Sequence, residues 1–472
     1  MINFKNAMKH YYLLFLFLTF SSKLICQTLV GDWFGILDIE NTKLKIVYHI
    51  EKKHGLLIGT MDSPDQGTFG LKLNFVSQRN NQVIFDMSSL GIKFDGVLEK
   101  NDSLVGTFKQ GNFSAPLNLE KSKIPIVGKP KRPQEPEPPF FYKRKEVSFV
   151  NKVDQVELSG TLTMPHGKGP FPAVVLVSGS GPQNRDGEIL NHKPFLVLAD
   201  FLTKNGMAVL RYDDRGVGKS KGNFEQANTA NFALDAQAAF NYLKSLKKID
   251  ENKIGIIGHS SGGMVASMIA ASDTQVRFIV LLASPGIPID QLMLKQTEVV
   301  SRQAGISEEE ILVSKELNRK FYNILLKEDN DEKAKIQIEK IVKDHISSMT
   351  PEIALQIQKD TPKLIKAMLT PWFRYFIRFN PEHYLKQINC PILALNGSKD
   401  CQVSAIENLD GIRNSVKEAN NKNVYTYIMP DINHLFQHCE RGSVDEYGKI
   451  EETFSLEVME IIRDWIKKTK FN

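Results

Sequence analysis

The segment from Lys253 to Gly263, which reads KIGIIGHSSGG, most constrains what this chain can fold into. Its apolar run has the length of a buried parallel strand, and the small residues after it predict a helix. Between the two lies the pattern G-x-S-x-G, centred on Ser260. In such a strand–turn–helix context the pattern is typical of a nucleophile elbow, a strained turn that exposes the serine hydroxyl. The segment therefore predicts a parallel strand that ends in a reactive serine.

Two further residues occur where a serine of this kind needs an acid and a base. In folds built around this elbow the three residues follow one another as Ser, Asp or Glu, and His. The apolar run 391–397 is followed by Asp400, and the run 424–429 is followed by His434. His434 would take the proton of Ser260 during attack, and Asp400 would fix the tautomer of the imidazole. The order along the chain predicts a catalytic triad.

Other residues on or near the same loops are alternatives for these roles. His438 is an alternative base four residues beyond His434, and Asp431 is a weaker acid because it shares the loop of the histidine. Asp400 has a second interpretation as a turn residue after a strand. We interpret His259, inside the elbow, as a packing residue whose ring is turned away from the reaction.

An oxyanion hole requires two backbone N–H groups close to the serine. The first is expected from Ser261, the residue after the nucleophile. The second is expected from the glycine-rich loop 178–182, which follows the apolar run 173–177. Ser180 is our candidate donor and Gly181 the alternative, although such a loop also occurs as a plain strand-to-helix connection. No Lys-Ser/Thr pair completes a phosphate-binding Walker motif there.

Taken together, these motifs resemble the α/β-hydrolase superfamily. More narrowly, they are similar to bacterial exported esterases close to the serine aminopeptidase-like hydrolases, here with an added N-terminal β domain. The resemblance implies an α/β-hydrolase fold with a mainly parallel sheet flanked by helices and a helical cap. It also implies that Asp213, Asp214 and Arg215 brace the structure. The lipase-type His-Gly-Gly-Gly motif is absent, which argues against action on esters of tertiary alcohols and against chemistry like that of hormone-sensitive lipase. The segments that carry the likeness are 178–187, 211–220, the elbow, 396–400 and 433–434.

The first 26 residues have the pattern of a signal peptide. Lys5 and Lys9 precede about ten apolar residues, too few for a membrane span of about 20 and suited to a signal-peptide core. We expect cleavage after Cys26 and export to the periplasm or the extracellular space. The bulky Ile25 argues against lipoprotein anchoring, and no later segment is long enough to span a membrane. The formal charge of +6 falls further on cleavage and gives no reason to expect nucleic acid binding.

Three cysteines follow the predicted cleavage site: Cys390, Cys401 and Cys439. An odd number in an oxidising compartment leaves at least one thiol free or paired between chains. A bridge between Cys401 and Cys439 would tie the loops of the acid and the base, and three free thiols is the simpler expectation. No His/Cys spacing indicates a metal site, and no cofactor is expected.

Hydrophobic patterning divides the rest of the chain into a β part and an α/β part. Eight short alternating runs predict an antiparallel barrel or sandwich. This β domain would either pack on the catalytic core and shield it, or contact a polymeric substrate or partner. Strand and helix patterns then alternate, which predicts a mainly parallel sheet, and a long helical block is inserted in it. Within that block the candidate pocket residues are Met368, Trp372, Phe373, Tyr375 and Phe376. The predicted parts are a signal peptide 1–26, a β-rich domain 27–120, a proline-rich linker 121–144, a first core part 145–286, a helical cap 287–386 and a second core part 387–472.

The combined features predict an exported, carboxylesterase-like serine hydrolase. It would cleave carboxylic esters through an acyl-enzyme and act on a small-molecule ester or a short peptide. The alternatives are a serine peptidase of the same fold, aminopeptidase or dipeptidyl-peptidase-like, and a thioesterase or acyltransferase. A peptidase would need an anchor for the charged terminus of its substrate, typically paired carboxylates in the cap. A non-enzymatic binding module would be expected to have lost a triad residue, and here all three are present. The sequence pattern predicts no particular oligomeric state.

Overall fold

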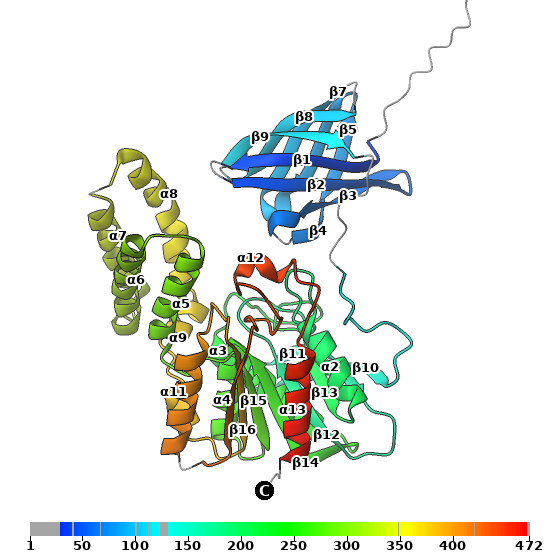
Figure 1. Cartoon of the computed structure of the whole chain (residues 1–472), viewed down its shortest axis with the longest axis vertical. Coiled ribbons are helices and arrows are strands. Elements are labelled where there is room, and N and C mark those ends of the chain that lie inside the picture. Colours follow the sequence, from blue (N-terminus) through cyan, green and yellow to red (C-terminus); the bar gives the residue numbers. More distant parts are fainter. Residues whose placement is uncertain are drawn as a thin grey trace, which may run out of the picture. The chain divides into compact units, whose positions relative to one another are not determined.

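The structure is a computed structural model that describes residues 29–39, 42–66, 68–99, 102–111, 113–122, 131–347, 349–419 and 421–469. The chain forms two compact units, Met1–Lys129 and Pro130–Asn472, whose elements are labelled in Figure 1. The predicted signal peptide 1–26 lies outside the described residues, as do residues 123–130 of the predicted linker.

Within the described residues the first unit is a single antiparallel sheet that curves into a half-barrel. Its order is β4-β3-β2-β1-β9-β8-β7-β6-β5, so the chain meanders except where β9 pairs with β1. The predicted antiparallel β domain is confirmed, with one curved sheet in place of a two-sheet sandwich. The strands are β1 (Gly31–Ile39), β2 (Thr42–Lys53), β3 (Leu56–Ser63), β4 (Thr68–Lys72), β5 (Phe75–Arg79), β6 (Gln82–Met87), β7 (Ile92–Glu99), β8 (Ser103–Gln110) and β9 (Phe113–Lys121), with short 3₁₀ turns at Pro64–Gln66 and Ser88–Leu90.

Alternation of apolar and polar residues gives this sheet one buried face. In β7, for example, Ile92, Phe94 and Leu98 are buried while Val97 and Glu99 are exposed. Burial of such a side chain contributes about 1.5–3 kcal/mol relative to its exposure. The buried face is rich in aromatic side chains, and the rings of Tyr48 and Phe85 lie 4.5 Å apart.

The second unit is built on an eight-stranded sheet of order β10-β11-β13-β12-β14-β15-β16-β17. The pairs β10/β11 and β11/β13 are antiparallel and the remaining pairs are parallel, which confirms the mainly parallel sheet. All five residues of the central strand β15 are buried, as expected of a strand covered on both faces. The strands are β10 (Lys143–Asn151), β11 (Val156–Met164), β12 (Phe171–Val177), β13 (Ala208–Tyr212), β14 (Ile249–His259), β15 (Phe278–Leu282), β16 (Ile392–Gly397) and β17 (Val424–Met429).

Helices cover both faces of this sheet. One apolar core joins a face of the sheet to α3 (Thr229–Lys244), α4 (Ser261–Ser272) and α11 (Ala405–Glu418). A second core joins the opposite face to α2 (Pro194–Lys204) and α13 (Leu456–Lys468). Two short helices, α10 (Glu382–Leu385) and α12 (Val444–Tyr447), lie in the connections. The result is a three-layer body with its parallel strands in the middle.

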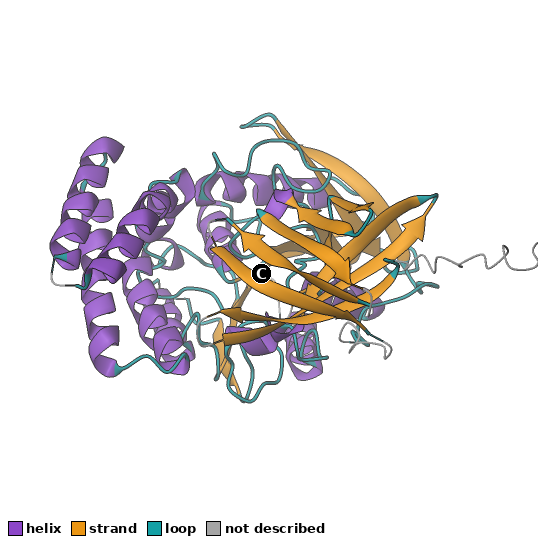
Figure 2. Ribbon diagram, turned by 90° about the horizontal axis from the view of Figure 1, so that it is seen from above, coloured by secondary structure: helices purple, strands orange, loops and turns teal. Residues whose placement is uncertain are grey.

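A group of helices between β15 and β16 occupies the region predicted to form a cap. Their shared core contains Leu292, Phe321, Ile338 and Phe376. Figure 1 shows these helices grouped beside the sheet of the second unit, and Figure 2 shows a group of helices in purple. At the start of α6 the Ser307 hydroxyl accepts a hydrogen bond from the backbone of Glu310, as in a capping box. The helices are α5 (Ile289–Gln303), α6 (Glu308–Lys327), α7 (Asp331–Ile346), α8 (Pro351–Met368) and α9 (Pro371–Ile377).

Residues 131–135, here called the strap, belong to the predicted linker but are part of the second unit. The Arg132 guanidinium donates to the backbone oxygens of Ile450 at 2.7 Å and Gly448 at 2.8 Å. The Gln134 amide accepts from the backbone nitrogens of Thr453 at 2.6 Å and Phe454 at 3.0 Å. This part of the chain is therefore held against the rest of the second unit and is no free spacer.

We predict that a fragment starting at residue 130 is more stable than one starting at residue 140. The shorter fragment loses the hydrogen bonds of Arg132 and Gln134. Since bonds to charged groups contribute about 1.5–3 kcal/mol each and the released carbonyls regain water, the expected loss is about 2–4 kcal/mol. Urea unfolding of both fragments measures the difference.

A matched variant separates the strap from a general effect of chain length. Arg132→Met in the longer fragment keeps the length and most of the apolar stem but removes the guanidinium. It should reproduce about half of the loss. Equal unfolding free energies for the two fragments would show that the strap adds nothing to the stability of the second unit.

Candidate active site

Ser260 lies in the sharp turn between β14 and α4. Its φ of 54° and ψ of −123° are unfavourable for a residue with a Cβ. The turn is held because the Ser260 N–H donates to Leu282 O at 2.8 Å and the Gly263 N–H donates to Ser260 O at 2.9 Å. A side chain at Gly258 would overlap the carbonyl oxygen of Gly262. A Cβ at Gly262 would overlap the carbonyl oxygen of Val177 at the end of β12. The two glycines of the G-x-S-x-G pattern are thus required by the close approach of the helix to β14 and to β12.

Asp400 and His434 meet beyond the carboxyl ends of two neighbouring strands, β16 and β17. The Nδ1 of His434 lies 2.7 Å from Oδ2 of Asp400, and both side chains are buried. The other carboxylate oxygen accepts the backbone N–H groups of Gln402 and Val403 at 2.8 and 2.9 Å. Because a carboxylate only accepts, the imidazole donates through Nδ1, which leaves Nε2 of a neutral ring as an acceptor.

The alternative acid and base are engaged elsewhere. His438 bonds through Nδ1 to Glu452 at 2.8 Å, and Asp431 forms an ion pair with Lys399 at 2.8 Å. Neither is among the described residues that line the cavity at Ser260. The structure brings His434 and Ser260 to one cavity and leaves these two residues outside it.

His259 packs against the loop of His434. Its Nε2 donates to the backbone oxygen of His434 at 2.9 Å, and the two rings lie 4.9 Å apart. Burial lowers the pKa of His259 to about 4, so the ring is neutral near pH 7. His259 packs against this loop as expected, and it is also among the described residues that line the cavity.

The two loops predicted to form an oxyanion hole lie next to each other. Ser261 is the first residue of α4, where backbone N–H groups have no partner within the helix. The Ser180 hydroxyl donates to the Ser261 hydroxyl at 3.1 Å. A Cβ added at Gly179 would lie 3.2 Å from the Cβ of Ser260, so this loop passes directly beside the serine. Gly181, the alternative donor, has a φ of 92° that favours glycine.

Asp214 holds both ends of that loop. Its two carboxylate oxygens accept from the Ser178 hydroxyl and from the Gln183 backbone N–H, each at 2.9 Å. Burial raises the pKa of Asp214 to about 7. Asp213 binds Arg185 through two hydrogen bonds of 2.7 and 3.0 Å. Asp213 and Asp214 thus hold neighbouring loops in place, which is the structural role that the family resemblance implies.

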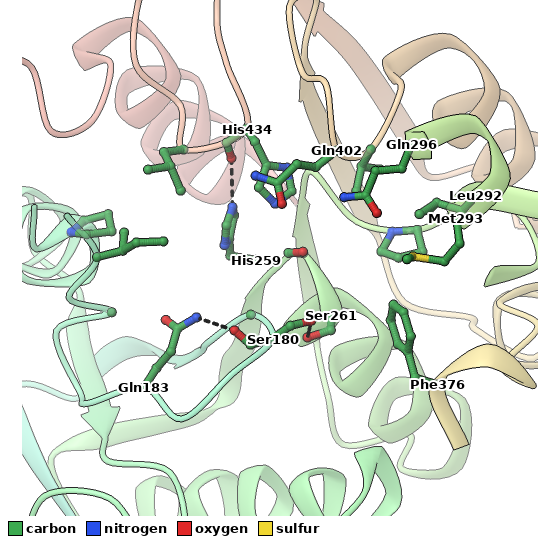
Figure 3. Close-up of a pocket in the computed structure, with 18 of the residues that line it drawn as sticks. Ser180, Gln183, His259, Ser261, Leu292, Met293, Gln296, Phe376, Gln402 and His434 are labelled. Atoms are coloured by element: carbon green, nitrogen blue, oxygen red, sulfur yellow. Dashed lines mark hydrogen bonds between the residues drawn. The ribbon is translucent and has the colours of Figure 1, made fainter. Parts of the chain in front are cut away.

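One cavity of about 330 Å³ opens at Ser260, and Figure 3 shows its lining. Helices α5 and α9 of the cap supply one side of it, and the loop of Ser180 supplies another. No Asp, Glu, Lys or Arg is found among its described lining residues. The lining comprises Gly179, Ser180, Gln183, Gly187, Ile189, Pro194, Phe195, His259, Ser260, Ser261, Pro285, Leu292, Met293, Gln296, Trp372, Phe373, Phe376, Gln402, Val403, His434, Leu435 and Phe454.

Sequence patterns identify only part of this lining. Trp372, Phe373 and Phe376 were expected at the pocket and line it, whereas Met368 and Tyr375 of the same stretch do not. The contribution of α5 is missed, although its residues recur at helical spacing, because a helical pattern does not tell which neighbour a face meets.

The described residues carry few other features that bear on chemistry. Cys390, Cys401 and Cys439 are free thiols, so the bridge between Cys401 and Cys439 is not formed. In the described part of the chain no cluster of three His, Cys, Asp or Glu side chains could hold a metal ion. None of the described helices is long and apolar enough to cross a membrane.

Comparison with known proteins relates the second unit to hydrolases. A family model described as "Serine aminopeptidase, S33" matches residues 192–438. Esterase EstD of Thermotoga maritima is 27% identical over 318 residues, 66% of this chain and 66% of that protein. Putative hydrolase YtaP of Bacillus subtilis is 29% identical over 151 residues, 29% of this chain and 50% of YtaP. The chain thus spans no more than two thirds of the length of either curated relative. The solved structure of the Pyrococcus furiosus esterase Pf2001 has a TM-score of 0.42 and 18% identity, over 69% of this chain and 91% of that chain.

Proposed function

The chain belongs to the serine aminopeptidase S33 family of α/β-hydrolases, and we propose that it cleaves carboxylic esters with Ser260, His434 and Asp400 as its catalytic residues. The α/β-hydrolase fold expected from the sequence is confirmed by the family match and by the sheet and its flanking helices. The observation that carries the proposal is the strained turn of Ser260, which opens on the same cavity as a histidine bonded to a buried carboxylate.

The geometry supports a two-step reaction through an acyl-enzyme. The Ser260 oxygen attacks the ester carbonyl while Nε2 of His434 takes its proton. The carbonyl oxygen becomes an oxyanion that accepts hydrogen bonds from the backbone of Ser261 and of the Ser180 loop. Collapse of this intermediate breaks the ester bond, and the leaving alcohol takes the proton from His434. Water then attacks the acyl-enzyme in the same way, which releases the acid and restores Ser260.

The charge of the cavity favours esters over peptides. An aminopeptidase or dipeptidyl peptidase must hold a charged terminus, and a buried charge without a partner is costly. The described lining contains no Asp or Glu, so the paired carboxylates that such a peptidase needs are not found there. A neutral ester loses no charge–water interactions when it enters this cavity.

A substrate panel tests the proposal. We expect the purified protein to hydrolyse 4-nitrophenyl esters of short and medium chain length. Because no charged group anchors a terminal amine, kcat/KM for aminoacyl-4-nitroanilides should be at least about 100-fold lower. Neutral N-acyl esters of the same amino acids serve as the control for side-chain fit. Faster cleavage of the free aminoacyl anilides than of the esters would replace the esterase proposal with a peptidase.

We also propose that the protein acts outside the cytoplasm. The charged and apolar pattern of residues 1–26 supports removal of a signal peptide. N-terminal sequencing of protein recovered from the periplasm or the medium should give Gln27 as the first residue. Recovery of full-length protein in the cytoplasm only would contradict export.

A further inference from the structure

Gln296 is a polar residue on the cavity-facing side of the cap helix α5. It lies one turn beyond Leu292 and Met293, and all three residues line the cavity. The neighbouring Lys295 has partners of its own, since it pairs with Glu298 and with Glu407 at 3.7 and 3.5 Å. In Figure 3 the Gln296 amide is directed toward the centre of the cavity.

The glutamine amides that line the cavity differ in whether they form hydrogen bonds with other residues of the protein. Gln402 donates to the Tyr447 hydroxyl at 3.3 Å, and Gln183 donates to the backbone oxygen of Ser180 at 3.2 Å. The side chain of Gln296 makes no hydrogen bond with any residue in the described part of the chain. Its amide can donate two hydrogen bonds and accept two, so it is available to a ligand.

The side of the cavity on which Gln296 lies carries apolar side chains, two of them flat aromatic rings. Trp372 and Phe376 of α9 stack with their rings 4.7 Å apart and 16° from parallel, and Leu292 and Met293 close the same side. In Figure 3 Leu292, Met293, Gln296 and Phe376 lie together on one side of Ser261, while Gln183 lies on the other. A flat apolar group fits such a wall.

A ligand that fills this side displaces the water around the Gln296 amide. If the ligand is wholly apolar, the amide is left without a partner, which weakens binding. A ligand with a matching hydroxyl restores the hydrogen bond. Sites built to hydrogen-bond a substrate hydroxyl discriminate strongly against the analogue that lacks it.

We propose that the cap side of the cavity binds an uncharged aromatic group of the ester that carries a hydroxyl, and that Gln296 recognises this hydroxyl. The proposal rests on the ester hydrolysis proposed above and specifies its substrate class. The neutral lining excludes a charged substituent at this place, and an amide suits a hydroxyl because both groups donate and accept. Gln296 is therefore a specificity-determining residue.

Two matched pairs of esters test this recognition in the full mature chain. Methyl (4-hydroxyphenyl)acetate and methyl phenylacetate differ by a hydroxyl in the acyl part. 4-Hydroxybenzyl acetate and benzyl acetate differ by a hydroxyl in the alcohol part. The pair whose ring occupies the cap side should show kcat/KM roughly tenfold higher for the hydroxylated ester. Gln296→Met, which keeps the length of the side chain, should bring this ratio to about one.

The controls separate this proposal from the general function. Gln291→Met changes an exposed glutamine of the same helix and should keep the wild-type ratio. Gln296→Leu is a second variant for the case in which Gln296→Met does not fold. An unchanged ratio in a folded Gln296 variant, or a ratio near one for both pairs in the wild type, would overturn the recognition while ester hydrolysis stands. Failure of the wild type to hydrolyse any ester would overturn the proposed function as well.

Discussion

Ser260→Ala should lower kcat for ester hydrolysis by about 10⁴–10⁶-fold, because triad residues act as a unit and the remaining groups accelerate the reaction only modestly. Alanine fits the turn without new contacts, and the backbone bonds of Ser260 to Leu282 and Gly263 do not involve the hydroxyl. The fold should therefore persist. Steady-state kinetics on a 4-nitrophenyl ester, together with labelling by a fluorophosphonate, measure the effect.

The matched control is Ser272→Ala at the end of the same helix. That hydroxyl bonds only to the backbone of its own helix, at Met268 and Ile269. The variant should label and turn over like the wild type. Labelling that persists in Ser260→Ala, at a different serine, would show that the nucleophile has been assigned wrongly.

The second large effect is expected at the base and the acid. His434→Ala should match the loss at Ser260, since no other described histidine with a free Nε2 lines the cavity. Asp400→Asn should lower kcat by about 10⁴-fold because an amide no longer selects the Nδ1–H tautomer. The amide oxygen can still accept the backbone N–H groups of Gln402 and Val403, so the loop should keep its shape.

His438→Ala provides the matched control for the base. It is half exposed and bonded to Glu452, and its loss should leave most of the activity. Circular dichroism of each variant establishes that the fold is intact. If His438→Ala were as inactive as His434→Ala, or Asp400→Asn nearly as active as the wild type, the acid–base pair would have to be sought elsewhere.

The elbow and the order of the candidate residues could be predicted because they depend on short stretches of chain. The two glycines around Ser260 are needed for steric reasons that any sequence with this turn must meet. The strand before Asp400, β16, is buried along its whole length, as expected of a parallel strand covered on both faces. The strand before His434, β17, lies at the edge of the sheet, where Tyr425 and Tyr427 are exposed. The two side chains meet because β16 and β17 are neighbours in the sheet. The Nδ1 of His434 lies 2.7 Å from Oδ2 of Asp400.

Features that depend on long-range contacts could not be predicted in this way. The proline-rich composition of 121–144 describes local stiffness, yet Arg132 finds its carbonyl partners more than 300 residues away in the chain. The spacing of α5 predicts an apolar face, but only the packed cap shows that Gln296 enters a cavity. Alternation in the β domain is equally compatible with one curved sheet or two packed sheets.

The strap has a consequence for how such a chain can be recombined. Gln134 binds the backbone of Phe454, and Phe454 lines the cavity. Proline-rich composition would place a crossover point for exchanging the N-terminal domain anywhere between residues 121 and 144. A hybrid joined after residue 135 would receive a foreign segment beneath the wall of its own active site. The part of the chain that must be kept intact in such an exchange therefore begins before the strap, within the proline-rich segment that resembles a spacer.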